Sequence, residues 1–348
     1  MTALVSRQLP GNRWPHLLVP NGKECSTLDF RGQGIQTIEV LPHVDPLSII
    51  YDRNAISSLA PLLHYVNLQQ LSASENKIKD LSDFPCLRHL TVLNLANNAI
   101  SHIQGLDSLY QLSWLNLSEN EIKVIDGLKN HSALEHLDLS DNAISSLGNL
   151  SHLLHLKILL LHGNCISSLR SSSAHLPASL VILSLAQNNI GDLNEVSYLA
   201  CLPNLQQLSV MNNPSVIMTA SHTGFDYRPF VVNWCYSLQV LDGYVVTEKE
   251  SLKAEWLFSQ GKGRLFRPGQ HLQLVQYLAS TCPLTTSREL ERAEDVRLSR
   301  ILRHQRVHQQ HLQEGQSSSS RPQRQLPDNP SAKSPSPRPV VSLCELRE

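Results

Sequence analysis

Leucine and isoleucine recur along this chain in one fixed pattern, separated by short polar stretches. The pattern L-x-x-L-x-L-x-x-N-x-I occurs as LTVLNLANNAI (90–100), LSWLNLSENEI (112–122), LEHLDLSDNAI (134–144), LKILLLHGNCI (156–166) and LVILSLAQNNI (180–190). A degenerate unit, STLDFRGQGI (26–35), precedes them with Gln33 in the Asn position. Spacing this regular indicates internal repeats of one structural unit.

The regular spacing is clearest at the Asn of the pattern. From Asn54 to Asn164 this Asn recurs at one constant interval, and the intervals to Asn188 and Asn213 are slightly longer. An Asn side chain carries donors and an acceptor, so it can pair turn amides and carbonyls that would otherwise be buried without partners. We therefore predict a ladder of stacked asparagines, made by Asn54, Asn76, Asn98, Asn120, Asn142, Asn164, Asn188 and Asn213.

Each repeat predicts one strand and one turn. In x-L-x-L, alternate side chains point to opposite faces, so Leu115 and Leu117 face the core while Trp114 and Asn116 face outward. The polar second half of each repeat predicts a convex turn of helix or 3₁₀ structure. The fold class is therefore an α/β solenoid, a curved array of about nine leucine-rich repeats over residues 25–222 with a parallel sheet on its concave face.

The ends of the chain differ from the repeats. Residues 1–24 predict an N-terminal arm, and residues 223–246 predict a cap over the last repeat. Residues 247–284 predict two flanking helices, the first opened by a capping box of Thr247 and Glu250. We expect a projecting polar helix over 285–313 and a disordered, Ser- and Pro-rich tail over 314–348.

Composition excludes several kinds of function. Lys and Arg number 29 against 30 Asp and Glu, so no overall field favours nucleic acid or an anionic membrane. Neither a signal peptide nor an apolar run of about 20 residues is visible. The seven cysteines are scattered, whereas secreted proteins of this type have clustered, disulfide-bonded cysteines at their ends. We therefore expect a cytoplasmic protein in a reducing compartment, without membrane or nucleic-acid partners.

Nothing in the chain predicts catalysis. GKGR (261–264) lacks the spacing of a phosphate-binding loop, and His304, His308 and His311 have no Cys or carboxylate nearby to complete a metal site. We therefore expect no enzyme activity, no cofactor and no metal.

The concave face is the predicted binding site. Outward positions in successive repeats form two rows, and in the middle of the array they combine an exposed apolar stripe around Trp114 with an edge of Asn and Asp. Exposed apolar surface marks binding sites, and Trp is enriched at their energetic centres. The alternative is that Trp114 lies flat against its neighbours and the stripe is incidental. The predicted partner-binding residues are Val92, Asn94, Trp114, Asn116, His136, Asp138, Ile158, Leu160 and Ile182.

Runs in the second half of the chain resemble a known family. HLDLSDNAIS, LPASLVILSLAQN, GFDYRPFVVNWC, KESLKAEWLFSQGKGR and RPGQHLQLVQYLASTCPLT are similar to the leucine-rich-repeat centriolar capping proteins, with the resemblance covering about residues 26–285. The resemblance implies a non-enzymatic scaffold at the centrosome and centriole, part of the cytoskeleton. It also implies centrosomal partners, among them the hundred-and-ten-kilodalton centriolar coiled-coil protein. With that partner, such a protein caps the distal end of the centriole and restrains cilium assembly.

The chain departs from that family in one respect. Members continue further and carry a calmodulin-binding I-Q-x-x-x-R-G helix and coiled-coil segments, and the chain has no such motif. We therefore expect a short form or paralogue and do not expect calmodulin binding.

Two other functions stay open. The cap portion YRPFVV…L-x-x-LDG…VT-x-x-E also resembles phosphatase regulators with 22-residue repeats, so a regulatory subunit of a Ser/Thr phosphatase is the leading alternative. Acidic and aromatic residues on the concave face would favour it. An enzyme activator or GTPase regulator is a third possibility, for which no loop Arg or Asn stands out.

Overall fold

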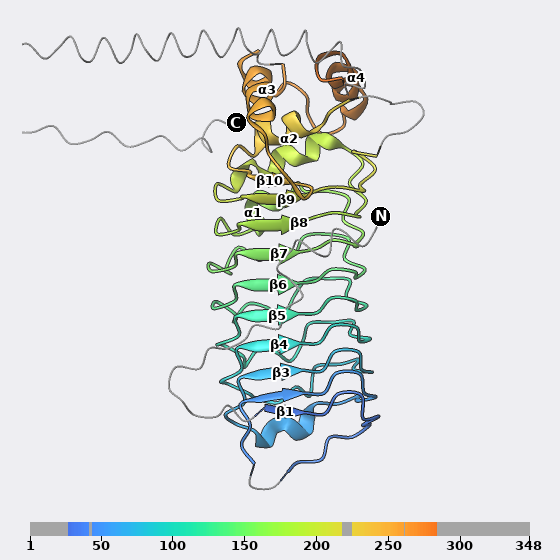
Figure 1. Cartoon of the computed structure of the whole chain (residues 1–348), viewed down its shortest axis with the longest axis vertical. Helices are drawn as coiled ribbons and strands as arrows, with labels where there is room; N and C mark the ends of the chain where they lie inside the picture. The colour runs from blue at the N-terminus through green and yellow to red at the C-terminus, as the bar shows by residue number, and fades with distance from the viewer. Residues whose placement is uncertain (1–26, 42–43, 218–224, 261, 284–348) are drawn as a thin grey trace, which may run out of the picture. The chain divides into compact units, whose positions relative to one another are not determined.

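The computed structural model of the chain describes residues 27–41, 44–217, 225–260 and 262–283. Within these ranges a single sheet of 11 strands runs in sequence order from β1 to β11. Figure 1 shows the strands stacked one upon another, with the last helices gathered at the C-terminal end. The strands are β1 (Thr27–Asp29), β2 (Ser48–Ile50), β3 (Gln70–Ser72), β4 (Val92–Asn94), β5 (Trp114–Asn116), β6 (His136–Asp138), β7 (Ile158–Leu160), β8 (Ile182–Ser184), β9 (Gln207–Ser209), β10 (Val240–Leu241) and β11 (Tyr244–Val245).

Each strand pairs with its neighbour at equivalent repeat positions. Leu93 is opposite Leu115, and Leu115 is opposite Leu137, as the constant repeat length requires. Strands β1 to β10 are parallel, and only β11 is antiparallel to its neighbour β10. The predicted solenoid with a parallel sheet is confirmed.

The core is a column of aliphatic side chains. The middle residue of each central strand is at most 1% exposed, as are the Leu residues that flank the strand. Burial of one such side chain contributes about 1.5–3 kcal/mol, and one repeat buries its share only when a neighbouring repeat covers it. The stability of any repeat therefore depends on those stacked beside it.

All eight predicted ladder asparagines bond across the interface between repeats. In Asn120, Oδ1 accepts from the amide of Ile100 at 3.0 Å, and Nδ2 donates to the carbonyls of Leu95, Leu117 and Ser118. The same arrangement recurs from Asn54 to Asn213. Each side chain thus closes the turn of its own repeat and joins it to the preceding one.

The residue before the ladder Asn has left-handed backbone in each of these repeats. It is acidic in three of them, Glu75, Glu119 and Asp141, with φ between 52° and 54°. In the repeat after Asp141 it is Gly163, with φ of 68°. The three acidic residues at this left-handed position are all exposed.

The convex side contains less helix than predicted. Residues 65–171 have strands and turns but no helix, with bonds such as Leu109 N to Leu106 O at 3.0 Å. Helical segments within the repeats are confined to η2 (Ala60–His64), α1 (Ser172–His175) and η3 (Leu193–Cys201). The α-helix α1 and the nine-residue η3 occur in the two longer repeats, whereas η2 is a five-residue 3₁₀ segment in a repeat of the constant length.

The predicted cap continues the sheet through two strands that were not predicted. Leu238 and Leu241 retain the L-x-x-L spacing around β10, and both are buried. Asp242 follows, and its Oδ1 accepts from Ser209 Oγ and from the amides of Val210 and Met211. Asp242 is in register with Ser209, so a carboxylate at the end of β10 bonds the amides that follow the last repeat strand.

Three helices complete the C-terminal end. They are α2 (Arg228–Trp234), α3 (Glu248–Ser259) and α4 (His271–Thr281). The predicted capping box is present at α3, since Glu250 N donates to Thr247 Oγ1 and Thr247 N donates to Glu250. Arg228 bonds Glu250 and also donates to the carbonyl of Leu241, so α2 joins α3 to the sheet. Near α4, Gly269 N donates to Asp192 Oδ2 at 2.5 Å beside η3.

Several predictions lie outside the described residues. These are the N-terminal arm over 1–24, the projecting helix over 285–313 with its three histidines, and the tail over 314–348.

Candidate partner-binding site

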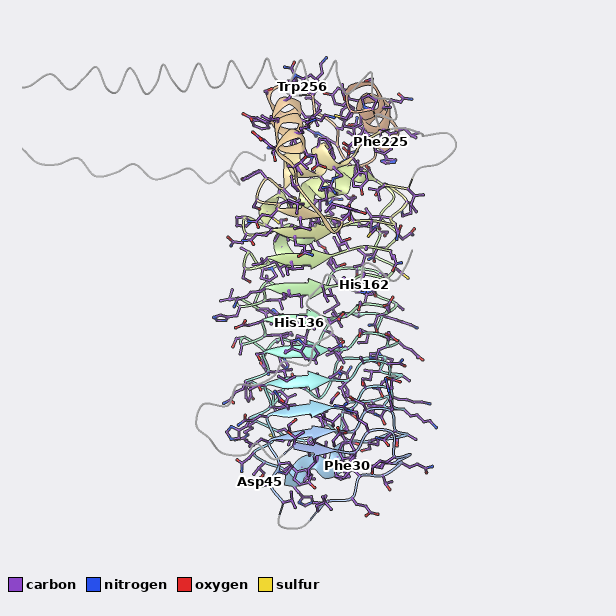
Figure 2. The ribbon with its side chains drawn as sticks, in the orientation of Figure 1. Phe30, Asp45, His136, His162, Phe225 and Trp256 are labelled. Atoms are coloured by element: carbon purple, nitrogen blue, oxygen red, sulfur yellow. The ribbon has the colours of Figure 1, made fainter. Side chains whose placement is uncertain are left out.

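The first and third residues of each strand make the outward surface of the sheet, which we call the sheet face. This is the face predicted to be concave, and the predicted site residues all lie on it, from β4 to β8. His136 lies midway along the stack of strands (Figure 2). The site is therefore formed by five consecutive repeats, and its predicted residues all come from strands.

The prediction of an exposed apolar stripe is wrong for two of its residues. Val92 and Leu160 are each only 4% exposed, whereas Trp114, Ile158 and Ile182 are partly exposed. Adjacent strands lie about 4.8 Å apart, so the exposure of an aliphatic side chain on the sheet face depends on how far the side chains of the two neighbouring strands cover it. The apolar surface that a partner can reach is centred on Trp114, Ile158 and Ile182.

Trp114 lies flat against the next repeat. Its ring stacks on the imidazole of His136 with centroids 5.1 Å apart and planes 14° from parallel. This contact agrees with the alternative prediction, in which Trp114 lies flat against its neighbours. The indole is nevertheless partly exposed. Stacking fixes the ring in one orientation, so a partner that packs on its open side orders little additional side chain.

His136 is buried beneath this contact. It is 7% exposed, and its Nε2 atom has no hydrogen-bond partner among the described residues. Burial lowers the pKa of His136 below its ordinary value of 6.5, with the carboxylate of Asp138 opposing the shift. The imidazole is therefore neutral at pH 7.

The third strand position carries a polar row. Asn116 Oδ1 accepts from the amide of Ser118 at 2.9 Å, and Asp138 Oδ1 accepts from the amide and hydroxyl of Ser140 at 3.0 and 2.6 Å. Asn94 Nδ2 donates to Ser72 Oγ at 3.1 Å. These local bonds hold the polar side chains beside the strand ends, next to the apolar centre.

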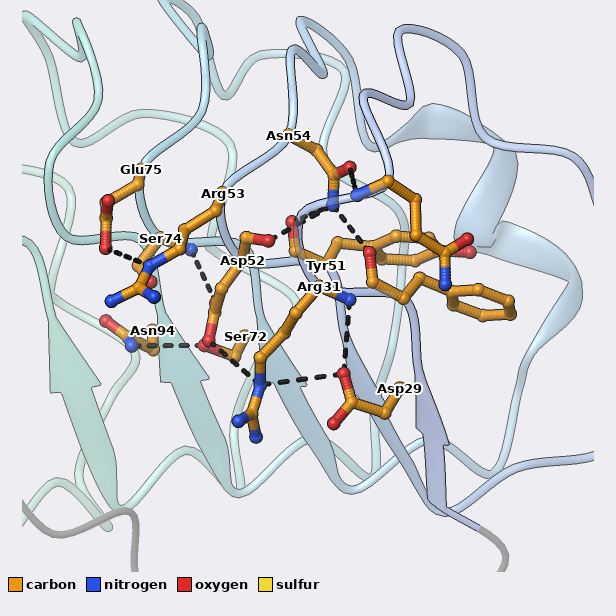
Figure 3. Close-up of polar contacts among 12 residues, drawn as sticks. Asp29, Arg31, Tyr51, Asp52, Arg53, Asn54, Ser72, Ser74, Glu75 and Asn94 are labelled. Atoms are coloured by element: carbon orange, nitrogen blue, oxygen red, sulfur yellow. Dashed lines mark hydrogen bonds and ion pairs between the residues drawn. The ribbon is translucent and has the colours of Figure 1, made fainter.

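Toward the N-terminal end the sheet face is covered by a paired charge network, shown in Figure 3. Arg31 Nε lies 3.5 Å from Asp29 and 3.9 Å from Asp52, and Asp52 Oδ1 accepts from Ser72 Oγ and Ser74 N. Arg53 pairs with Glu75 at 3.1 Å. The charges of the first repeats are thus largely satisfied within the chain.

Glu119 and Asp141 also belong to this site, although they were not among the predicted residues. Both follow their strands at the left-handed position and are exposed, so they extend the polar row of Asn116 and Asp138. The signal that could have found them is the recurrence of an acidic residue directly before the ladder Asn.

Neither a metal site nor a membrane span is found in the described part of the chain. No group of three or more His, Cys, Asp and Glu residues there could hold a metal ion. None of the helices in those ranges is both long and apolar enough to cross a bilayer.

The strand register, the Leu core and the Asn ladder define a leucine-rich-repeat protein. In agreement, the family profile described as leucine-rich repeat matches residues 115–267, and a profile of two leucine-rich-repeat copies matches residues 66–108. The chain is similar to the centrosomal protein of 97 kDa, with 64% identity to the human protein over 143 residues and 60% identity to the Xenopus laevis protein over 163 residues.

The extent of this similarity differs from the expected one. The matches cover 41% and 45% of this chain, which is less than the range 26–285 over which the resemblance was expected. They cover 16% of the human relative and 20% of the Xenopus relative, so the chain spans a small part of the length of these relatives. Among solved structures, an internalin (inlF) from Listeria monocytogenes is similar, with a TM-score of 0.48 and 21% identity over 66% of this chain and 70% of that chain.

Proposed function

We propose that the chain is a non-enzymatic protein-binding scaffold of the centrosome and centriole in the cytoplasm. Two observations support this function. The curated relatives at 60–64% identity carry the name of a centrosomal protein, and leucine-rich repeats are a fold that binds other proteins along one surface. On the sheet face, the described side chains pack against one another and form hydrogen bonds within the chain.

The partner-binding surface in this proposal is the sheet face around Trp114. The observation that carries it is the partly exposed indole fixed on His136 at the centre of the sheet. A large, pre-oriented aromatic ring with apolar neighbours and a polar edge is typical of the energetic centre of a protein interface. Ile158 and Ile182 extend the apolar surface, and Asn116 and Asp138 supply hydrogen-bond groups beside it.

The partner we propose is the hundred-and-ten-kilodalton centriolar coiled-coil protein. With it, the chain would cap the distal end of the centriole and restrain cilium assembly. This step rests on the family resemblance and on the ability of a long sheet face to hold a helical or extended segment.

The test compares two aromatic substitutions in the full-length chain. Trp114→Glu alters the centre of the sheet face, whereas Tyr110→Glu alters a ring that is 56% exposed and precedes the strand. Each variant and the wild type serve as bait in extracts of ciliating cells, with retained proteins identified by mass spectrometry. We expect centriolar coiled-coil proteins on the wild type and on Tyr110→Glu but not on Trp114→Glu.

One observation favours the alternative of a phosphatase regulatory subunit. Acidic residues follow the strands at Glu75, Glu119 and Asp141, and acidic residues on this face were expected of that class. The same experiment separates the two functions, because retention of a phosphatase catalytic subunit in place of centriolar proteins would contradict the centrosomal scaffold.

A further inference from the structure

We propose that the partner segment held on the sheet face is basic and amphipathic. Its apolar side chains pack on Trp114 and Ile158, and its Lys or Arg side chains pair with Glu119 and Asp141, which are both exposed. The inference rests on the proposed function, since it names the chemistry of the partner at the same surface. It is drawn from how charge is distributed along the repeats.

Positive and negative side chains balance in the first repeats. Arg31 lies between the carboxylates of Asp29 and Asp52, and Arg53 bonds Glu75 (Figure 3). Just before strands β6 and β7, Lys157 Nζ lies 2.8 Å from Glu135. These carboxylates are therefore compensated within the chain.

The carboxylates at the central strand ends are not compensated in this way. In the described part of the chain, no Lys or Arg forms an ion pair with Glu119, Asp138 or Asp141. Glu119 accepts from the amide side chain of Asn97 at 3.1 Å, and Asp138 accepts from Ser140. His162 Nε2 lies 3.8 Å from Asp141 Oδ2, which is an ion pair only when the imidazole is protonated.

These carboxylates lie in neighbouring repeats at one end of the strands. Glu119 N donates to Ser140 O and Asp141 N donates to His162 O, so Glu119 and Asp141 occupy equivalent positions in adjacent repeats. Repeats stack at the strand spacing of about 4.8 Å, so both residues lie on one stretch of the surface, with the Glu119 carboxylate bonded to Asn97 in the preceding repeat and the Asp141 carboxylate beside His162 in the following one. Asp138 belongs to the same repeat as Asp141 and is only 8% exposed, so it adds negative charge but little accessible surface. Basic side chains of a bound segment would supply the cations that these carboxylates lack.

The same strands carry the apolar centre. Trp114 begins β5, Glu119 follows the end of β5, and Asp141 follows the end of the neighbouring strand β6. His136, which is 7% exposed, lies beside Trp114 on this face with Nε2 unpartnered in the described residues. One stretch of the array thus combines an apolar surface, a buried nitrogen without a hydrogen-bond partner and carboxylates without ion pairs. These features match a segment that has apolar residues on one side and basic residues on the adjacent side.

Charge complementarity of this kind governs partner choice more than total affinity. It steers association and disfavours acidic segments, and its effect weakens as salt is added because exposed charges are screened beyond about 8 Å at physiological ionic strength. A basic partner should therefore bind with strong salt dependence.

The test selects partners from a random peptide library displayed on phage, using the full-length chain as the target. Three further targets are Trp114→Glu, the double variant Glu119→Lys and Asp141→Lys, and the double variant Asp83→Lys and Glu255→Lys. The last two change the net charge equally, and Asp83 and Glu255 are exposed residues away from the sheet face. Thermal unfolding followed by circular dichroism establishes that each variant is folded.

We expect the wild type and the Asp83/Glu255 variant to enrich peptides that combine apolar residues with an excess of Lys and Arg. A synthetic peptide from that selection should bind the Glu119/Asp141 variant at least about tenfold more weakly. Enriched peptides that are neutral or acidic, or basic peptides that bind the Glu119/Asp141 variant unchanged, would overturn the inference and leave the proposed surface intact. Failure of the wild type to enrich any peptide over Trp114→Glu would instead contradict the proposed surface itself.

Discussion

The indole of Trp114 lies parallel to the imidazole of His136 in the next repeat, with ring centroids 5.1 Å apart. The contact joins two repeats on the sheet face, in addition to the hydrogen bonds between strands β5 and β6. It also helps to bury His136, so that the imidazole favours its neutral form. One aromatic pair thus couples the centre of the proposed binding surface to the stability of the array.

Stability should fall in mildly acidic solution because two histidines are buried. Burial lowers the pKa of His131 and of His136 below 6.5, so the unfolded chain binds more protons than the folded one as the pH falls through that value. The free energy of unfolding should be level above about pH 7 and decrease below about pH 6.5. Urea unfolding at a series of pH values measures this.

The matched variants for that experiment are His136→Gln and His89→Gln. His89 is exposed, so its replacement should leave the pH dependence as in the wild type. A pH dependence that His136→Gln leaves unchanged would mean that this imidazole is not responsible.

Removal of one ladder asparagine should destabilise the repeats strongly. Asn120→Leu leaves the amide of Ile100 and the carbonyls of Leu95 and Leu117 without their partner. Each buried polar group left unpaired costs about 1–3 kcal/mol, so we expect a loss of at least about 3 kcal/mol in the free energy of unfolding. Asn130→Ala, at an exposed Asn outside the ladder, should cost less than about 1 kcal/mol by the same chemical denaturation.

Substitution of glycine by alanine should be tolerated at Gly191 but not at Gly127. Gly127 has φ of 71°, and a Cβ there would lie 1.8 Å from the carbonyl oxygen of Ile103 in the preceding repeat. Gly127→Ala should therefore lower the melting temperature sharply, with a cost of about 2–4 kcal/mol from strain and displaced packing. Gly191→Ala meets no atom within 4 Å and should leave stability equal or slightly higher. Equal melting temperatures for the two variants would contradict the close stacking of turns.

The cap should depend on Arg228. Burial raises the pKa of the partly buried Glu250, but the hydrogen bonds from Arg228 and from the amide of Thr247 outweigh it and lower the pKa overall. Arg228→Met removes this partner and the donor to Leu241 O, and we expect a loss of about 2–3 kcal/mol.

The comparison for that variant is Arg53→Met, which removes an ion pair to Glu75 that is open to solvent. Such exposed pairs contribute at most about 1 kcal/mol. Thermal unfolding of both variants should therefore show a clear decrease only for Arg228→Met, and the opposite order would contradict the role assigned to the cap.

The repeat fold could be predicted from the sequence because one period fixes strand, core and turn together. A Leu or Ile at the middle of each repeat strand and an Asn three residues after the last Leu of the pattern leave little freedom in how the repeats stack. The burial of Val92 and Leu160 could not be predicted in this way, because it depends on the side chains of the neighbouring strands. The strands β10 and β11 were missed since Gly243 and Val246 replace the second Leu and the Asn of the pattern. The role of Glu119 and Asp141 could not be predicted either, because the sequence does not show which carboxylates form ion pairs within the chain.

The most direct test is the affinity of the purified chain for the purified hundred-and-ten-kilodalton centriolar coiled-coil protein, measured by isothermal titration calorimetry. Wild type, Trp114→Glu and Tyr110→Glu are titrated side by side after circular dichroism has shown equal folding. We predict that the wild type and Tyr110→Glu bind alike and that Trp114→Glu binds at least about a hundredfold more weakly, as expected for an aromatic centre of an interface. Equal affinity of the wild type and Trp114→Glu would contradict the assignment of the sheet face as the binding surface.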